Sequence, residues 1–203
     1  MKIALFGTSA DPPTFGHLAI LRWLVPRFDH VAVWASDNPF KADQVALSHR
    51  TRMMQLLVQE LHLPATKVRV YPELSYPRTL FTLAKAKEYW PEGEFTLTIG
   101  ADIVPQIPTW YQAQQLLSQV HLVVIPRPGY ALEPAAIDRL KQLGTTVEIA
   151  DLATPDVSST AYRTQPQAHS VPPSIQSYIQ QEQLYEWPDE TQKPRMMQQP
   201  ASY

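Results

Sequence analysis

The chain has 203 residues, of which 44% are hydrophobic and 18% charged, a size and composition that suit one soluble domain with a buried core. Seventeen basic and nineteen acidic residues give a net charge of -2, which argues against a protein dominated by nucleic-acid binding. The chain has no cysteine, no apolar stretch long enough to span a membrane and no signal-peptide core, so we expect a cytoplasmic protein without disulfides or thiolate metal sites.

Short β-rich runs alternate with helix-like stretches along the chain. The β-rich runs lie at residues 2–6, 30–35, 67–71, 95–99, 121–126 and 145–150. The clearest helix-like stretches lie at residues 48–62, 79–90, 111–119 and 133–143. This alternation indicates right-handed βαβ crossovers. We therefore predict a single α/β domain with a Rossmann-like, mostly parallel sheet and helices on both faces.

Local residues mark the ends of some of these elements. Ser48 is a good N-cap for the first long helix, and Gly144 follows the 133–143 stretch as a C-cap glycine would. Residues 171–185 still have helical spacing, but after Trp187 the composition turns to Pro, Gln, Lys and acidic residues. We therefore expect the domain to cover residues 1–187 and residues 188–203 to form a disordered tail.

The predicted sheet also says where a ligand would bind. In open parallel sheets, ligands lie at the carboxyl ends of the strands, which here selects the loops at 7–16, 36–47, 72–79, 100–110 and 127–132. The chain has only six glycines, with no three inside six residues and no two five apart. Neither a dinucleotide fingerprint nor a Walker A loop can be assembled from them. A nucleotide phosphate would have to be met by cationic side chains and helix N-termini.

The first of these loops carries the strongest motif. Gly7 and Gly16 are placed where a missing side chain lets a ligand approach the backbone. His17 then falls in the first turn of a helix, where its ring can offer a directional hydrogen bond or, when protonated, a charge. Packing at a helix start is the other interpretation of His17, with about even odds on composition alone.

The wider pattern resembles the nucleotidyltransferase superfamily that carries the His-x-Gly-His signature. The matching residues are Gly7, Thr8, Asp11, Pro12, Thr14, Gly16 and His17. Thr14 replaces the first histidine, as in the pantetheine-phosphate adenylyltransferase branch, and would give phosphate a hydrogen bond without a charge. The superfamily's second signature, Ser-Ser-Thr-x-x-Arg, matches Ser158, Ser159, Thr160 and Arg163. A serine there can cap a helix, and the arginine can fork onto phosphates.

Further segments are similar to bacterial nicotinate-nucleotide adenylyltransferases over most of residues 1–185. They are Asn38–Lys41, Arg50 with Met53, Thr79 with Thr82, Gly100–Asp102, Pro108–Tyr111, Arg127–Gly129 and the closing helix at 171–185. Arg78 departs from the family, which has tyrosine at that position. The resemblance implies that Trp110 stacks on the pyridine ring and that backbone N–H groups near Thr79 and Tyr111 hold the nicotinate carboxylate. An indole face suits a flat heterocycle.

The resemblance also implies a role for each remaining residue. The expected catalytic residues are His17, Lys41 and Arg163. The expected ATP-binding residues are Gly7, Thr8, Thr14, Gly16, His17, Gly100, Asp102, Ser158, Ser159, Thr160 and Arg163. The expected acceptor-binding residues are Lys41, Thr79, Thr82, Trp110, Tyr111 and Arg127.

The implied reaction is adenylyl transfer from ATP to nicotinate mononucleotide, with Mg²⁺ bridging phosphate oxygens and no all-protein metal cage. We expect no nucleic-acid or membrane partner. Two alternatives remain open, a pantetheine-phosphate adenylyltransferase and a non-catalytic nucleotide sensor on the same fold; an aminoacyl-tRNA synthetase fragment is also considered. The Trp110-Tyr111 segment speaks against the first, the two phosphate motifs against the second, and the absence of a Lys-Met-Ser-Lys-Ser loop against the third.

Overall fold

A computed structural model describes residues 1–37, 44–165, 167 and 169–185 of the chain. The strands are β1 (Lys2–Thr8), β2 (His30–Ala35), β3 (Val68–Val70), β4 (Glu94–Gly100), β5 (His121–Ile125) and β6 (Val147–Ile149). The helices are α1 (Phe15–Leu24), α2 (Leu47–Gln59), α3 (Thr79–Tyr89), α4 (Ala113–Leu117), α5 (Pro134–Gln142), α6 (Ser159–Thr164) and α7 (Pro173–Gln181), with 3₁₀ helices η1 (Pro72–Leu74) and η2 (Ala101–Thr109). The predicted tail at 188–203 and Lys41 lie outside the described residues.

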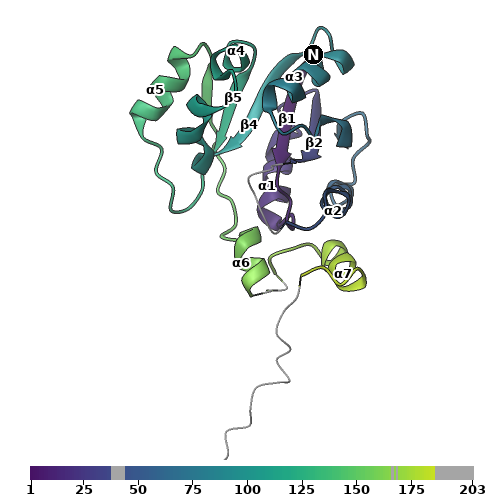
Figure 1. Ribbon diagram of the computed structural model, residues 1–203. Coiled ribbons are helices and arrows are strands. Elements are labelled where there is room, and N and C mark those ends of the chain that lie inside the picture. The colour runs from purple at the N-terminus through teal and green to yellow at the C-terminus, as the bar shows by residue number, and fades with distance from the viewer. Residues whose placement is uncertain (38–43, 166, 168, 186–203) are drawn as a thin grey trace, which may run out of the picture.

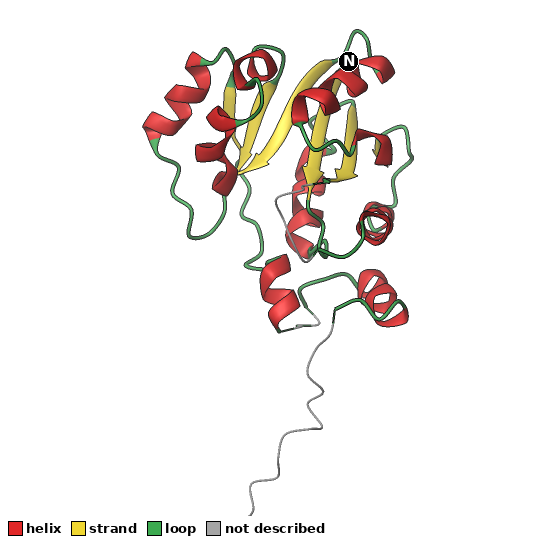
Figure 2. Cartoon of the chain, viewed as in Figure 1, coloured by secondary structure: helices red, strands yellow, loops and turns green. Residues whose placement is uncertain are grey.

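The strands form one sheet in the order β3-β2-β1-β4-β5-β6 (Figures 1 and 2). All five neighbouring pairs among these strands are parallel. The predicted α/β fold with a Rossmann-like parallel sheet is therefore confirmed. The chain order reverses between β1 and β4, and this reversal creates the crevice in which doubly wound sheets bind ligands.

Side chains alternate between two hydrophobic cores, one on each face of the sheet. In β1, Ala4 and Phe6 belong to one core while Ile3 and Leu5 belong to the other, as the two-residue period of a strand requires. Helices α1, α2 and α7 contribute buried residues to the first core, and α3, η2, α4 and α5 to the second. Because helices cover both faces of the central strands, a ligand can reach the sheet only at the ends of its strands.

Most predicted element ends are confirmed to within a few residues, and Gly144 lies just after α5 with a φ of +100°, as a C-cap glycine does. The Ser48 prediction was wrong, because α2 already begins at Leu47 and Ala46 occupies the N-cap position. Arg50, rather than a capping serine, ties this end of the helix to the neighbouring backbone.

The segment after β4 differs most from the sequence prediction. Residues 101–109 were expected to be a loop, yet they form the 3₁₀ helix η2 with Pro105 and Pro108 inside it. The following helix was expected over 111–119 but covers only Ala113–Leu117, since Gln112 has a φ of +49°. Prolines suggest a loop in a sequence, whereas consecutive short turns tolerate them because few of their N–H groups are needed.

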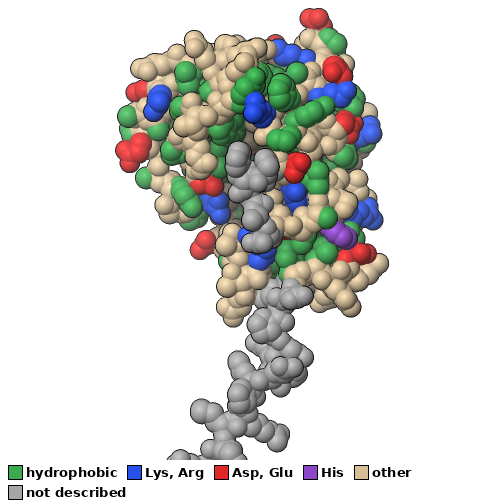
Figure 3. Space-filling model, viewed as in Figure 1, with side chains coloured by type: hydrophobic (Ala, Val, Ile, Leu, Met, Phe, Trp, Pro, Cys, Tyr) green, Lys and Arg blue, Asp and Glu red, His purple; other side chains and the backbone are tan. Residues whose placement is uncertain are grey.

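The distribution of surface charge and the length of the helices concern two partners considered in the sequence analysis, nucleic acids and membranes. On the face drawn in Figure 3, basic and acidic side chains are interspersed with hydrophobic ones, so that face carries no large field of one sign. Within the described ranges, the helices are too short and too polar to cross a membrane.

The C-terminal helices α6 and α7 pack beyond the sheet end, beside the loop that follows β1 (Figure 1). The Tyr185 hydroxyl donates a 2.7 Å hydrogen bond to Asp11 Oδ1, linking residues 174 positions apart. Asp11 is 1% exposed, so its carboxylate depends on partners supplied by the protein. The end of the domain therefore holds the first loop in place.

Replacing Tyr185 with Phe removes this donor while keeping the ring. Loss of a partner to a buried carboxylate costs about 1–3 kcal/mol. Tyr185→Phe should therefore lower the melting temperature by about 2–10 °C for a chain of this size. The control is Tyr89→Phe, which removes the 2.7 Å hydrogen bond to Glu73 at an exposed site and should leave the melting temperature nearly unchanged. Equal melting temperatures for both variants in a thermal melt would contradict the prediction.

Candidate active site

The candidate site lies where β1 and β4 end side by side. Thr8 closes β1 and Gly100 closes β4, and the two strands pair directly. The loop after β1 leads into α1, whose third residue is His17. The predicted rim loops at 7–16 and 100–110 are thus brought to one edge of the sheet, at the reversal of strand order.

His17 is held in one tautomer by its neighbours. The backbone N–H of Thr14 donates a 3.0 Å hydrogen bond to Nδ1, so the ring proton is placed on Nε2, which lies 3.0 Å from the Thr8 hydroxyl. Burial, and to a smaller extent the positive charge of Arg127, lowers the pKa of His17 from 6.5 to about 4. The imidazole is therefore neutral near pH 7, and it offers a hydrogen-bond donor rather than a charge.

Thr14 acts through His17 instead of facing a ligand. Its side chain is 1% exposed, and Oγ1 lies 3.0 Å from His17 Nδ1. The predicted hydrogen bond from Thr14 to a phosphate conflicts with this burial, because a side chain turned into the loop does not reach solvent. The threonine orients the histidine that follows it.

The glycines of the site make room for the protein's own side chains. A Cβ on Gly7 would lie 2.3 Å from the Trp34 indole, and one on Gly100 would lie 2.5 Å from Asp102 Oδ1. A Cβ on Gly16 would come within 3.3 Å of Thr14 Oγ1. The Trp34 indole is thus sufficient to require glycine at position 7, whereas the contact at Gly16 is only tight. Space for a ligand, the explanation offered from the sequence for both glycines, stays a prediction.

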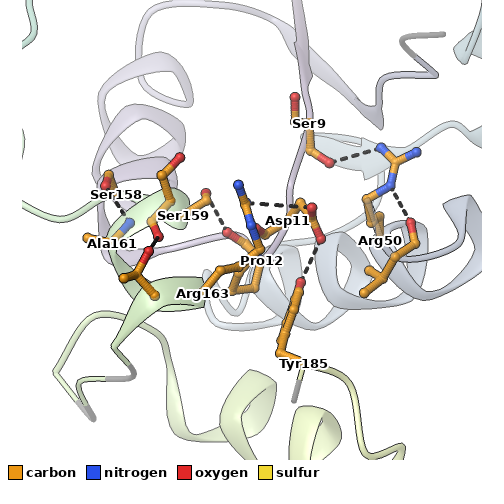
Figure 4. Close-up of polar contacts among 12 residues, drawn as sticks. Ser9, Asp11, Pro12, Arg50, Ser158, Ser159, Ala161, Arg163 and Tyr185 are labelled. Carbon is orange, nitrogen blue, oxygen red and sulfur yellow. Dashed lines mark hydrogen bonds and ion pairs between the residues drawn. The ribbon is translucent and has the colours of Figure 1, made fainter. Parts of the chain in front are cut away.

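The two signature segments touch each other at the loop after β1 (Figure 4). The Ser159 hydroxyl donates to the Pro12 carbonyl at 2.8 Å. Arg163 Nη1 donates to the Asp11 carbonyl at 2.5 Å and lies 3.5 Å from Asp11 Oδ2. Residues about 150 positions apart thus form one polar cluster beside His17.

The contacts that the structure gives for the second signature are internal. Ser158 is the N-cap of α6, as predicted, and its hydroxyl accepts the Ala161 N–H at 3.0 Å. The Ser159 hydroxyl donates to the Pro12 carbonyl instead of capping the helix, and the expected ATP binding by Ser159 stays a prediction. Thr160 is exposed at the start of the same helix.

Arg50 and Asp11 are buried charged residues to which the sequence analysis gave no role. Arg50 is 3% exposed, and its Nη1 donates to the Ser9 carbonyl at 3.0 Å (Figure 4). Nη1 also donates to the Ser36 carbonyl at 2.7 Å, and Nε donates to the Val45 carbonyl at 2.9 Å. It joins the loop after β1 to both ends of the loop that contains Lys41. A charged residue three positions before Met53 on the apolar face of a helix was the available signal.

The predicted acceptor side is assembled from α3 and the segment after η2. Trp110 is partly buried against the second core, and Tyr111 is 43% exposed. The Arg78 guanidinium lies over the Tyr111 ring, 4.1 Å from Cζ to the ring centroid. This contact brings the start of α3, where Thr79 is the first residue, to the segment that contains Tyr111. Binding of the nicotinate carboxylate there stays a prediction.

Thr82 does not belong to this surface. Its side chain is 1% exposed, and its hydroxyl donates to the Leu74 carbonyl at 2.9 Å. One helical turn after Thr79, the same face of α3 has already entered the core, so the structure gives no support to direct acceptor binding by Thr82. Thr82 anchors α3 to η1 instead.

Asp102 and Arg127 complete the rim on the β4–β5 side. Arg127 Nη1 lies 3.1 Å from Asp102 Oδ2, and the two side chains are 44% and 25% exposed. Because Arg127 acts on the pKa of His17, its charge lies within electrostatic reach of the β1 loop. The described residues contain no cluster of three or more His, Asp or Glu that could hold a metal ion.

Comparisons with known proteins agree with this geometry. A family model described as Cytidylyltransferase-like matches residues 5–165. A Synechocystis protein described as a probable nicotinate-nucleotide adenylyltransferase is 44% identical over 198 residues, which cover 91% of this chain and 99% of that protein. The Bacillus subtilis nicotinate-nucleotide adenylyltransferase is 28% identical over 91% of this chain and 98% of its own length.

Solved structures show the same fold. The Plasmodium falciparum nicotinic acid mononucleotide adenylyltransferase complexed with NaAD superposes with a TM-score of 0.76 at 18% identity, covering 91% of this chain and 97% of that one. Its complex with APC gives a TM-score of 0.72 at 17% identity. On the family model and the Synechocystis relative, the chain belongs to the cytidylyltransferase-like family and, within it, to the nicotinate-nucleotide adenylyltransferases.

Proposed function

We propose that the protein transfers the adenylyl group of ATP to nicotinate mononucleotide, giving deamido-NAD and pyrophosphate, and that it does so in the cytoplasm as part of NAD biosynthesis. The observation that carries this proposal is the contact between the two signature segments. Arg163 and Ser159 reach Asp11 and Pro12, so the residues expected to meet a triphosphate surround one place. The names of the relatives favour nicotinate mononucleotide over phosphopantetheine as the acceptor.

The chemistry needs no protein nucleophile. A phosphate oxygen of the acceptor attacks the α-phosphorus of ATP in line, forming the new P–O bond. The bond from the α-phosphorus to the bridging oxygen breaks, and pyrophosphate leaves with its electron pair. An ionised acceptor phosphate gives up no proton. Catalysis therefore depends on holding two highly charged substrates together and stabilising the charge that moves onto pyrophosphate.

The residues proposed for this task include one neutral hydrogen-bond donor and two cations. His17, neutral and fixed by Thr14, donates its Nε2–H to a phosphate oxygen once that oxygen replaces the Thr8 hydroxyl. Arg163 supplies positive charge at the opposite side of the loop. Lys41, which lies outside the described residues, is assigned to the phosphates by the family motif alone.

Mg²⁺ would enter this site with the substrate. Mg²⁺ keeps several waters and binds through substrate phosphates with one or two carboxylates. The described residues fit that mode: they offer Asp102 at the rim and no cluster of three acidic or histidine ligands. When bound, the ion would neutralise phosphate charge and ease the departure of pyrophosphate.

The proposal is tested by incubating the purified chain with ATP, Mg²⁺ and each acceptor in turn, and measuring pyrophosphate. Nicotinate mononucleotide should support turnover, and phosphopantetheine should not. Turnover with phosphopantetheine alone would reject the proposed acceptor. No turnover with any acceptor by folded protein would favour the non-catalytic sensor.

Replacing His17 with Ala removes the donor aimed at the reacting phosphate. Loss of one preorganised contact of this kind should lower kcat by about a hundredfold or more. His121→Ala is the matched control, because His121 is an exposed histidine at the start of β5, at the other end of the sheet. Steady-state kinetics on both variants, with melting curves to show that they fold, check the prediction. Turnover of folded His17→Ala within a few-fold of His121→Ala would remove His17 from the catalytic residues.

The lowered pKa of His17 gives a second prediction. Since the folded pKa is about 4, the ring should stay neutral with its proton on Nε2 down to about pH 5. The unfolded chain binds this proton near pH 6.5, so His17 contributes to a loss of stability as the pH falls from about 6.5 towards 4. Long-range ¹H–¹⁵N NMR spectra, assigned with His17→Asn, measure the tautomer and the pKa. A midpoint near 6.5 in the folded protein would contradict this.

The acceptor site should prefer nicotinate over nicotinamide mononucleotide. N–H donors that converge on a carboxylate bind it more strongly than an amide, whose NH₂ leaves groups unpaired at about 1–3 kcal/mol each. The expected preference in kcat/KM is about ten- to several-hundred-fold. Stacking hardly distinguishes the two rings, so Trp110→Ala should weaken both acceptors by similar factors. The measurement is kcat/KM for each acceptor at saturating ATP. Equal wild-type values would exclude the nicotinate assignment.

A further inference from the structure

Arg78 carries a charge that the rest of the described structure leaves unbalanced. Three other arginines on the surface are paired with carboxylates: Arg27 with Asp151, Arg127 with Asp102 and Arg163 with Asp11. Among the residues that the structure describes, no acidic side chain lies within ion-pair distance of Arg78. Its side chain is exposed, and its guanidinium lies over an aromatic ring.

That ring belongs to a different rim segment. Arg78 Cζ lies 4.1 Å from the centroid of the Tyr111 ring, and the Phe81 ring packs at 5.8 Å on the same tyrosine. Phe81 and Tyr111 are 45% and 43% exposed, so the three side chains form an open aromatic and cationic surface. The stacking joins the start of α3 to the segment after η2.

The position of this charge is unfavourable for the free protein. The N-terminal end of a helix has positive potential, and an acidic residue there is stabilising. In α3 the first turn contains no acidic residue, and Arg78, in the N-cap position, makes no side-chain capping bond. A cation placed there adds to the positive end of the helix. Such an arrangement costs stability unless an anion balances it.

We propose that Arg78 determines acceptor specificity: held on Tyr111, its guanidinium places a positive charge beside the carboxylate of the acceptor's pyridine ring. This inference rests on the proposed function and adds a residue to it. A flat ring that bears a carboxylate matches the surface in both respects, with aromatic faces for the ring and charge for the anion. The corresponding amide gains only the aromatic contact.

The charge acts on binding more than on the reacting phosphorus. Two unit charges about 5 Å apart near a protein surface interact by an amount that corresponds to a five- to tenfold or larger change in binding. The carboxylate is remote from the bond that breaks, so the effect should enter through KM for the nicotinate acceptor and leave kcat nearly unchanged. Salt should weaken it, because the surface is exposed.

The test measures kcat/KM for nicotinate and nicotinamide mononucleotides in wild type, Arg78→Gln and the control Arg52→Gln. Arg52 is an exposed arginine on α2 whose side chain contacts only Gln55 among the hydrogen-bond partners described. Arg78→Gln should reduce the nicotinate preference by about five- to tenfold, mainly through KM, and the remaining preference should depend less on salt. Arg52→Gln should keep the wild-type preference.

A double-mutant cycle tests whether the charge of Arg78 favours the nicotinate acceptor only while its guanidinium is stacked on Tyr111. If Arg78 acts through its place on Tyr111, Tyr111→Leu should also reduce the preference, and adding it to Arg78→Gln should reduce it no further. Acceptor Kd values measured by calorimetry without ATP give the same comparison independently of turnover.

The inference is overturned if Arg78→Gln keeps the wild-type preference or if Arg52→Gln loses as much of it. It is also overturned if the losses caused by Arg78→Gln and Tyr111→Leu add in the double variant. The proposed function fails in a different way. Wild-type protein would then release no pyrophosphate with nicotinate mononucleotide, whatever residue stands at position 78.

Discussion

The site depends on one buried carboxylate. Asp11 is almost completely enclosed in the loop that orients His17, and burying a charge is costly unless hydrogen bonds and opposite charge compensate it. That compensation comes from the far end of the domain, through the Tyr185 hydroxyl and the Arg163 guanidinium. The loop after β1 can therefore keep its geometry only when the C-terminal helices have packed. The two signature segments, from opposite ends of the chain, become one unit for this reason.

Around the same loop, a neutral side chain and charged side chains occupy different positions. His17 is partly buried and uncharged, so it can give a directional hydrogen bond without repelling the nearby Arg127. The cations Arg163 and Arg127 stand further out, each already in contact with a carboxylate. An incoming polyphosphate would compete with those carboxylates for the arginines. The paired aspartates thus keep the arginines ordered before substrate binds.

Much of the fold and part of the site could be predicted from the sequence. The six strands, their parallel arrangement and the helix that carries His17 follow from local patterns, because alternation and glycine placement are local properties. Contacts between distant residues do not follow from such patterns. Nothing near Thr82 indicates that its hydroxyl meets Leu74, and nothing near Gly7 indicates that Trp34 fills its space. The residues of η2 were predicted to form a loop because they include two prolines, which are typical of loops.

Arg50 has a consequence for how this family can vary. Its guanidinium holds the carbonyls of Ser36 and Val45, the residues on either side of the Lys41 loop, and it does so through backbone atoms. Backbone carbonyls are present whatever the side chains are. Apart from Lys41, which the proposed function assigns to the phosphates, the positions between these two anchors can therefore vary in sequence while the points of attachment stay the same. A segment from another acceptor-binding protein could be grafted between Ser36 and Val45, with Arg50 holding the backbone at both ends.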